Sequence, residues 1–181
     1  MVVKIENQPK LKVISSTLLS DSDRNLVLSL CNRAYEEDLG PLFNTLQPTT
    51  HILGYYKQTL VTHAMWVDRF LQTGKNLPMH TTYIEMVATA KAYRNRGFAT
   101  LVMKRLADEI RDFDLGALSP FSVAYYKSLG WQLWEGPLFV RIGPGVIHTP
   151  QEEVMIFRLP QTPKLDLNEA LSAEWREGEL W

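Results

Sequence analysis

Residues 87–100 read VATAKAYRNRGFAT and join three local patterns. The segment 80–89 that leads into them is rich in β-branched and aromatic residues, which predicts a strand. The segment 91–97 is basic and ends in glycine, as loops often do. Apolar residues at helical spacing follow: Phe98, Leu101, Val102, Leu106 and Ile110. The sequence therefore predicts a strand, a basic loop and the start of a long helix in direct succession.

The junction between this loop and the helix has the chemistry of a phosphate-binding site. The first N–H groups of a helix have no intrahelical acceptor, and the positive end of the helix dipole points the same way. Gly97 and Ala99 leave room for a pyrophosphate against the backbone, while Lys91, Arg94 and Arg96 add positive charge. Spacing alone leaves open a solvated basic turn whose glycine serves the backbone shape. The segment is neither a P-loop nor a dinucleotide fingerprint, because both glycine patterns are absent.

The neighbouring segments predict a mixed sheet with helices. Strand 80–89, helix 98–112 and strand 113–118 form a β-α-β unit, whose crossover implies a locally parallel pair. Ser20 to Asp23 offer a cap for a helix in which Cys31 reads as a small core residue. Lys57-Gln58 is a poor turn pair, so the register of hairpin 50–70 stays open. Further strands are predicted at 10–16, 50–56, 59–70, 131–142 and 153–159, a short helix within 36–48, and a helix over 122–129.

Composition excludes several classes of protein. A chain of 181 residues with 45% hydrophobic and 22% charged residues forms a folded domain, not a disordered chain. A net charge of -1 argues against nucleic acid as the main partner. A single cysteine excludes a disulfide framework, and the four histidines show no metal spacing, so no metal is expected. No apolar run has the length of a signal peptide or a membrane span, so we expect a cytoplasmic protein.

The pattern Arg94-x-x-Gly97-x-Ala99 after a strand resembles the acetyl-CoA pyrophosphate motif of GCN5-related N-acetyltransferases (GNAT), and residues 122–131 resemble the late helix of that superfamily. Other segments are similar to aminoglycoside 2′-N-acetyltransferases: 83–88, 115–119, 126–131, 134–137 and the final EWREGELW, residues 174–181. The resemblance implies an α/β GNAT fold of the α+β, mixed-sheet kind. Its central sheet is mostly antiparallel, with a splayed parallel pair, flanking helices and a bulge near Glu85–Val87.

The same resemblance implies one N-acetyltransferase domain over residues 1–181. Residues 160–181 would be a C-terminal tail that folds back over the substrate cleft. Trp175 and Trp181 favour packing of this tail, because a disordered tail rarely keeps two tryptophans.

The catalytic residues implied are Glu85 and Tyr126. In the family pattern, Glu85 would accept a proton from the substrate ammonium through water, and the backbone near Val87 would polarise the thioester carbonyl. Tyr126 would protonate the departing CoA thiolate at close to an ordinary tyrosine pKa, with Tyr125 assigned to the core. From the residues alone, Glu85 could instead be an outward-facing strand residue and Tyr126 a packing tyrosine.

The binding residues follow from the same resemblance. Those implied for acetyl-CoA, a co-substrate, are Val87, Ala88, Thr89, Arg94, Asn95, Arg96, Gly97, Phe98, Ala99 and Thr100. Those implied for the substrate are Asp38, Ser119, Glu179 and Trp181, the last through its terminal carboxylate. Carboxylates suit a polycationic aminoglycoside. Relatives also suggest a homodimer, with no nucleic acid and no membrane as partner.

One departure from the family pattern bears on the substrate. Relatives that act on disubstituted deoxystreptamines carry a second aspartate shortly after the one matching Asp38, whereas residues 40–43 here are Gly-Pro-Leu-Phe. The loss of an acid suits a substrate with fewer amines, so kasugamycin ranks level with the gentamicin and tobramycin class, in each case with antibiotic resistance as the role. Two alternatives stay open: an acetyltransferase of another small amine, such as a polyamine or amino sugar, and a catalytically silent acyl-CoA-binding domain.

Overall fold

A computed structural model describes residues 7–181, which divide into two compact units. The first comprises the described residues up to Trp66 together with Glu85–Leu106; the second comprises Val67–Ile84 and Ala107–Trp181. Three elements contribute residues to both units: β3 (Thr59–Thr73), β4 (Met79–Thr89) and α3 (Phe98–Glu109). The expectation that the chain starts without a signal peptide falls on residues 1–6, which lie outside the described residues.

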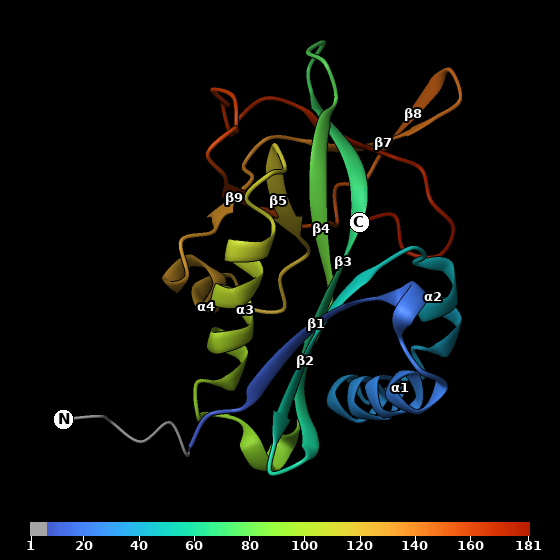
Figure 1. The fold of residues 1–181 in the computed structure, drawn as a ribbon. Helices are drawn as coiled ribbons and strands as arrows, with labels where there is room; N and C mark the ends of the chain where they lie inside the picture. The colour runs from blue at the N-terminus through green and yellow to red at the C-terminus, as the bar shows by residue number, and fades with distance from the viewer. Residues whose placement is uncertain (1–6) are drawn as a thin grey trace, which may run out of the picture. The chain divides into compact units, whose positions relative to one another are not determined.

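The first unit is built on an antiparallel sheet. β1 (Lys10–Ser15) pairs with β2 (Thr50–Tyr56), which pairs with the first half of β3 (Figure 1). Lys57 and Gln58 form the hairpin turn with φ of 47° and 66°. Two successive positive φ values give the turn that matches the twist of the two strands, so this register is set without a glycine.

The helices of the first unit follow their sequence signals. α1 (Asp21–Tyr35) begins at the cap Ser20, whose side chain accepts a hydrogen bond from the Asp23 N–H, and it buries Val27, Leu30 and Cys31. The predicted short helix is α2 (Gly40–Thr45). One-turn helices η1 (Ser16–Leu18) and η2 (Lys91–Tyr93) complete the connections. The helical predictions for this part of the chain are confirmed.

The second unit contains a mixed sheet in the order β6-β9-β5-β4-β3-β10-β7-β8. The parallel pair predicted from the β-α-β pattern is confirmed, because Thr81 of β4 is opposite Leu115 of β5. β10 is antiparallel to β3 on one side and parallel to β7 on the other. The elements not yet bounded are β5 (Leu115–Leu118), α4 (Val123–Ser128), β6 (Gln132–Leu133), β7 (Leu138–Ile142), β8 (Gly145–His148), β9 (Met155–Arg158) and β10 (Leu171–Glu174).

The prediction of a single strand over 131–142 is wrong. The structure divides it into β6 and β7, and Gly136 lies in the break between them. The Glu135 and Gly136 N–H groups both donate to the Leu167 carbonyl, at 2.9 and 2.8 Å. A Cβ atom at Gly136 would lie 2.0 Å from the Glu169 carbonyl oxygen, so only glycine fits this approach. β8 and β10 were not predicted.

Residues 160–181 are packed into the second unit. They supply β10, and Leu171, Ala173 and Trp181 join the buried core around Tyr83. Trp181 is 3% exposed and Trp175 is 49% exposed, so only one of the two tryptophans is anchored. No helix within residues 7–181 combines the length and apolar character needed to cross a membrane.

Candidate active site

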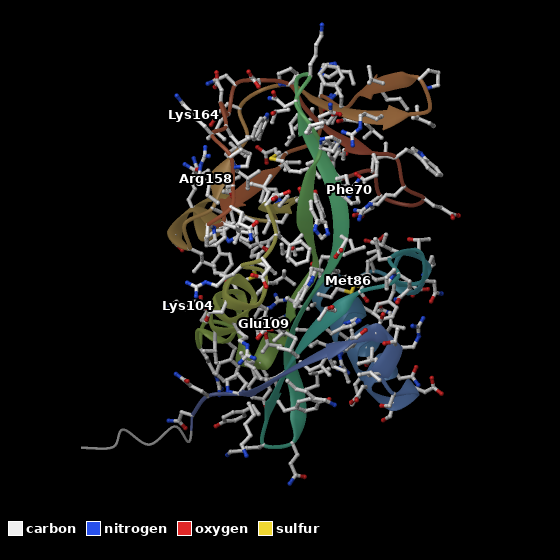
Figure 2. All side chains as sticks on the ribbon, turned by 45° about the horizontal axis from the view of Figure 1, so that its top comes forward. Phe70, Met86, Lys104, Glu109, Arg158 and Lys164 are labelled. Carbon is white, nitrogen blue, oxygen red and sulfur yellow. The ribbon has the colours of Figure 1, made fainter. Side chains whose placement is uncertain are left out.

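Met86, which Figure 2 labels, lies in the second half of β4 and departs from strand geometry. Its φ is 48°, in the left-handed region that residues with a side chain rarely adopt, and it is buried. Such a conformation costs about 1–3 kcal/mol and persists only where the surroundings impose it. A bulge was expected near Glu85–Val87, and the feature that the structure shows at this place is the left-handed backbone of Met86.

Side chains donate hydrogen bonds to the backbone carbonyls of β4 around this point. The Met86 carbonyl lies 2.9 Å from His63 Nδ1, and the Val87 carbonyl accepts from the Tyr35 hydroxyl at 3.2 Å. The Ala88 carbonyl accepts from the Thr62 hydroxyl at 3.1 Å. Three consecutive carbonyls are thus held by donors on α1 and β3, which fixes the direction of the backbone after Glu85.

Glu85 itself is only 8% exposed. The alternative of an outward-facing strand glutamate is therefore excluded for this residue. A largely buried carboxylate beside a strained backbone residue is a suitable proton acceptor in a protected site.

The loop 91–97 ends in two residues with positive φ, Asn95 at 61° and Gly97 at 76°. The Leu101 N–H donates to the Gly97 carbonyl at 3.0 Å, so α3 begins there. The N–H groups of Phe98, Ala99 and Thr100 consequently have no intrahelical acceptor. A Cβ atom at Gly97 would meet no atom within 4 Å, so open space lies beside this helix start. The donor set and the space both fit a pyrophosphate.

The side chains of this loop divide between structural and exposed roles. Arg94 donates to the Thr89 carbonyl at 3.3 Å and to the Ala34 carbonyl at 3.2 Å, so it ties the loop to α1 and β4. The Arg96 guanidinium lies 5.2 Å from the ring centroid of Tyr93. The Phe98 side chain is 4% exposed and packs beside Tyr56 and Tyr93. Phe98 can therefore serve a cofactor only through its backbone.

Asp38, an expected substrate residue, is exposed in the connection between α1 and α2. Its Oδ1 atom accepts from the Gly40 N–H at 3.0 Å and from Asn32 Nδ2 at 3.4 Å. Phe43, three residues after Gly40, is wholly buried beneath Arg24, whose guanidinium lies 4.6 Å from the ring centroid. The Phe43 ring therefore belongs to the core and offers no surface to a substrate.

Tyr126, the expected proton donor, lies in the second unit at 2% exposure. Its ring packs edge-on against Phe121, Tyr125 and Trp131. Burial raises the pKa of Tyr126, and the neighbouring Tyr125 adds to the rise. The expectation of a nearly ordinary pKa is therefore wrong, and Tyr125, which was assigned to the core, is only partly buried. The hydroxyl remains protonated throughout the physiological range.

Sequence reasoning missed Arg69, which holds the C-terminal segment of the second unit. It is 1% exposed and donates to the Leu180 carbonyl at 2.9 Å and the Glu174 carbonyl at 2.6 Å. Its guanidinium also lies 5.1 Å from the ring centroid of Tyr83. Trp181 Nε1 donates to the Thr149 hydroxyl at 2.8 Å. The only available signal was an arginine within the apolar run 64–71.

The predicted site residues are distributed over both units. Asp38, Glu85 and all ten residues expected at acetyl-CoA belong to the first, whereas Ser119, Tyr126, Glu179 and Trp181 belong to the second. Ser119 is exposed just after β5, and the Glu179 carbonyl accepts a hydrogen bond from Arg176 Nε. Within residues 7–181, no group of three or more His, Cys, Asp or Glu side chains is arranged to hold a metal ion.

Known proteins resemble this chain in sequence. The family model described as Acetyltransferase (GNAT) domain matches residues 17–134. The aminoglycoside 2′-N-acetyltransferase of Mycolicibacterium fortuitum is 34% identical over 129 residues, which cover 67% of this chain. The chain spans 66% of the length of that relative, just under two thirds.

Solved structures share the fold at low sequence identity. A GNAT family N-acetyltransferase from Escherichia coli in complex with CoA has a TM-score of 0.64 at 14% identity, covering 91% of this chain and 89% of its own. A GCN5-related N-acetyltransferase from Kribbella flavida has a TM-score of 0.56 at 19% identity, covering 71% of this chain but 35% of its own. The predicted GNAT fold is confirmed. With the family model matching well over half of its length, the chain belongs to the GNAT acetyltransferase family.

Proposed function

We propose that this acetyltransferase transfers the acetyl group of acetyl-CoA to the 2′-amine of an aminoglycoside and thereby confers resistance. The observation that carries the proposal is the 34% identity to an aminoglycoside 2′-N-acetyltransferase over two thirds of the chain. We further propose that the enzyme acts in the cytoplasm as a homodimer, as the resemblance implies.

For acetyl-CoA, the proposal assigns the pyrophosphate to the start of α3. The N–H groups of Phe98, Ala99 and Thr100 point out of the helix end without intrahelical acceptors, and Gly97 has open space beside it. Thioester binding falls to the segment after Met86, where Val87 N–H would polarise the acetyl carbonyl. Val87, Ala88 and Thr89 would contact the pantetheine arm through the backbone.

The proton balance assigns two roles. A substrate ammonium must lose one proton before its nitrogen can attack the acetyl carbonyl, and Glu85 would accept that proton through water. When the tetrahedral intermediate collapses, the C–S bond breaks and the second amine proton must reach the sulfur. Tyr126 would donate a hydrogen bond to the sulfur as it leaves. Because its pKa is raised by burial, complete proton transfer costs more than it would for an exposed tyrosine.

For the amine substrate, the proposal assigns Asp38, Ser119, Glu179 and the Trp181 carboxylate. The C-terminal segment from Pro160 would lie over the substrate, with Arg69 fixing the backbone at Leu180. Between Asp38 and the core residue Phe43, the surface residues are Pro41 and Leu42 instead of an acid. A substrate with fewer amines, such as kasugamycin, suits this surface as well as the gentamicin class does. The same feature favours a second candidate, acetylation of a smaller amine such as a polyamine or amino sugar.

A thiol-release assay tests the substrate assignment. Purified enzyme with acetyl-CoA is offered kasugamycin, gentamicin, tobramycin and spermidine, and the acetylated position is identified by NMR. Release of CoA with an antibiotic, with acetate on the 2′-nitrogen, is the expected result. Turnover of spermidine alone would replace the aminoglycoside by the second candidate. Binding of CoA without turnover of any amine would leave a silent acyl-CoA-binding domain.

A further inference from the structure

Three buried polar side chains of the first unit form one continuous chain that ends on the strained residue of β4. Thr49 Oγ1 lies 2.9 Å from His51 Nε2, and His51 Nδ1 lies 3.0 Å from His63 Nε2. His63 Nδ1 lies 2.9 Å from the Met86 carbonyl oxygen. Thr49 is 3% exposed and both histidines are 0% exposed, so water cannot substitute for a missing partner.

Elementary bonding rules fix every proton in this chain. A carbonyl oxygen only accepts, so His63 Nδ1 must carry a hydrogen. A neutral imidazole then has a bare Nε2, which obliges His51 Nδ1 to donate. The same rule leaves His51 Nε2 bare, so the hydroxyl of Thr49 must donate to it. The protons therefore run in one direction, from Thr49 through both rings to Met86.

Both rings are held in the neutral form that this pattern requires. Burial lowers the pKa of His51 to about 4, with a further contribution from the charge of Arg24. Burial and the adjacent His51 lower the pKa of His63 to about 3. Cys31 adds a second donor, since its sulfur lies 3.9 Å from the Met86 carbonyl and burial raises the thiol pKa to about 12. The carbonyl thus receives donors on both lone pairs.

We infer that Thr49, His51 and His63 are positioning residues that hold Met86 in its left-handed conformation. A rotation of the Met86 carbonyl would leave the buried imidazole N–H with only a weak acceptor, the Cys31 sulfur 3.6 Å away, and this loss is of the same order as the strain of the conformation. Holding this carbonyl also sets the direction of the adjacent Val87 N–H and of the strand after Glu85. The roles of the Val87 N–H and of Glu85 in catalysis rest on the proposed function. The conformation of Met86 does not depend on it.

Matched substitutions separate positioning from packing. His63→Leu keeps the ring volume approximately but removes the donor to Met86, whereas an Asn side chain in His63→Asn can offer an N–H near the Nδ1 position. We expect His63→Leu to lower kcat by about tenfold to a hundredfold. The affinity of this variant for acetyl-CoA should also fall, and approach its affinity for CoA. His63→Asn should recover most of both losses. Thr49→Val should shift both in the same direction, but less, while Thr49→Ser behaves as the wild type.

Two further measurements test the inference independently of the proposed substrate. Val27→Ala opens a cavity in the same core and should match the stability loss of His63→Leu without changing kcat. Nitrogen NMR of the wild type should show His63 protonated at Nδ1, a result that needs no substrate. An Nε2-protonated His63, or wild-type kcat and acetyl-CoA preference in folded His63→Leu, would overturn the inference. Failure of every aminoglycoside as substrate would instead affect only the proposed function.

Discussion

The two units hold critical backbone carbonyls by opposite means. In the first, a neutral imidazole, His63, holds the single carbonyl of Met86. In the second, a buried cation, Arg69, holds the carbonyls of Glu174 and Leu180, both more than a hundred residues away in sequence. The neutral chain depends on one tautomer and can be broken by protonation. The guanidinium depends on no tautomer; burial and the neighbouring Arg176 lower its pKa, while the Glu174 carboxylate opposes this fall.

The difference also shows what each device can do. One imidazole N–H fixes the direction of one peptide group, which suits an oxyanion donor that must be aimed. A planar guanidinium offers several donors in a fixed fork and can join segments with no local connection, which suits the anchoring of a tail. Substitutions in each unit test whether His63 and Arg69 are needed where they occur.

Removal of the cation should have the largest effect on stability. Arg69→Met leaves two carbonyls and the Glu174 carboxylate around an apolar side chain, so we expect a loss of about 3–5 kcal/mol in the free energy of unfolding. Denaturant titration measures this loss. Arg158→Met is the control, because Arg158 is an exposed strand arginine bonded to Gln132 and should cost less than about 1 kcal/mol. Equal losses in both variants would show that Arg69 is not an anchor.

Tyr126, the proposed proton donor in the second unit, should affect the rate but not the stability. Tyr126→Phe is expected to lower kcat by about 10²–10⁴-fold with smaller changes in KM, since the hydroxyl acts only as the sulfur leaves. Because its pKa is raised, Tyr126 should produce no loss of activity between pH 7 and 9. Tyr125→Phe is the control and should keep kcat. A Phe variant with normal turnover would return Tyr126 to a packing role.

Protonation should weaken the neutral chain of the first unit as the pH falls. The pKa of a histidine is about 6.5 in the unfolded chain, but about 4 for His51 and about 3 for His63 in the folded protein. Between these values the unfolded state binds more protons, so stability falls with decreasing pH by about 1.4 kcal/mol per unit for each ring. The effect is absent above about pH 6.5.

The measurement compares wild type with His63→Leu across that window. The variant lacks one of the two titrating rings, so its stability deficit should shrink as the pH drops from 6.5 toward 4. The deficit of Val27→Ala should stay constant over the same range, because no ionisable group is removed. A His63→Leu deficit that does not change with pH would mean that His63 is charged in the folded protein.

Charge at the exposed loop of the first unit should act on affinity alone. Gly97→Asp places a carboxylate beside the start of α3, where the proposal puts the pyrophosphate, and we expect at least about a tenfold loss of CoA affinity. Gly97→Ala carries the same penalty of a side chain at positive φ without the charge. Calorimetry with CoA distinguishes them. Equal affinities for the two variants would remove the phosphate assignment.

Local sequence patterns predicted more of the first unit than of the second. The Ser20 cap, the face of α1 and the crossover from β4 to β5 depend on residues close in sequence, and all were predicted. β10 depends on pairing with β3 and β7, a contact that no local pattern records. Its four residues look like part of a polar tail until the partner strands are known.

The same limit applied to the candidate site. The basic loop was predicted from a compact motif and Glu85 from the family resemblance, but Arg69 and the pairing of His51 with His63 were not predicted. Their partners lie on other strands or in the C-terminal segment, so their sequence neighbours carry no trace of the contact. For aromatic residues, the sequence overestimated exposure. Phe43 and Phe98 lie beside motif residues and could be expected to contact a ligand, yet both side chains are buried. Burial depends on the whole unit and not on adjacency to a motif.

The smallest expected effect concerns selectivity and again uses exposed charge. Pro41→Asp adds a carboxylate in the first turn of α2, at an exposed position where an acid also suits the helix dipole. We expect kcat/KM for gentamicin or tobramycin to rise about two- to fivefold relative to kasugamycin, the scale of one solvent-exposed ion pair. Pro41→Asn has nearly the same shape without the charge and should show no gain. The gain should also diminish as salt is added, because exposed charges are screened. Equal kcat/KM ratios for the Asp and Asn variants would mean that this turn does not face the amines.

Phe43→Asp should not change selectivity but should unfold the first unit, because it would bury the carboxylate in the core.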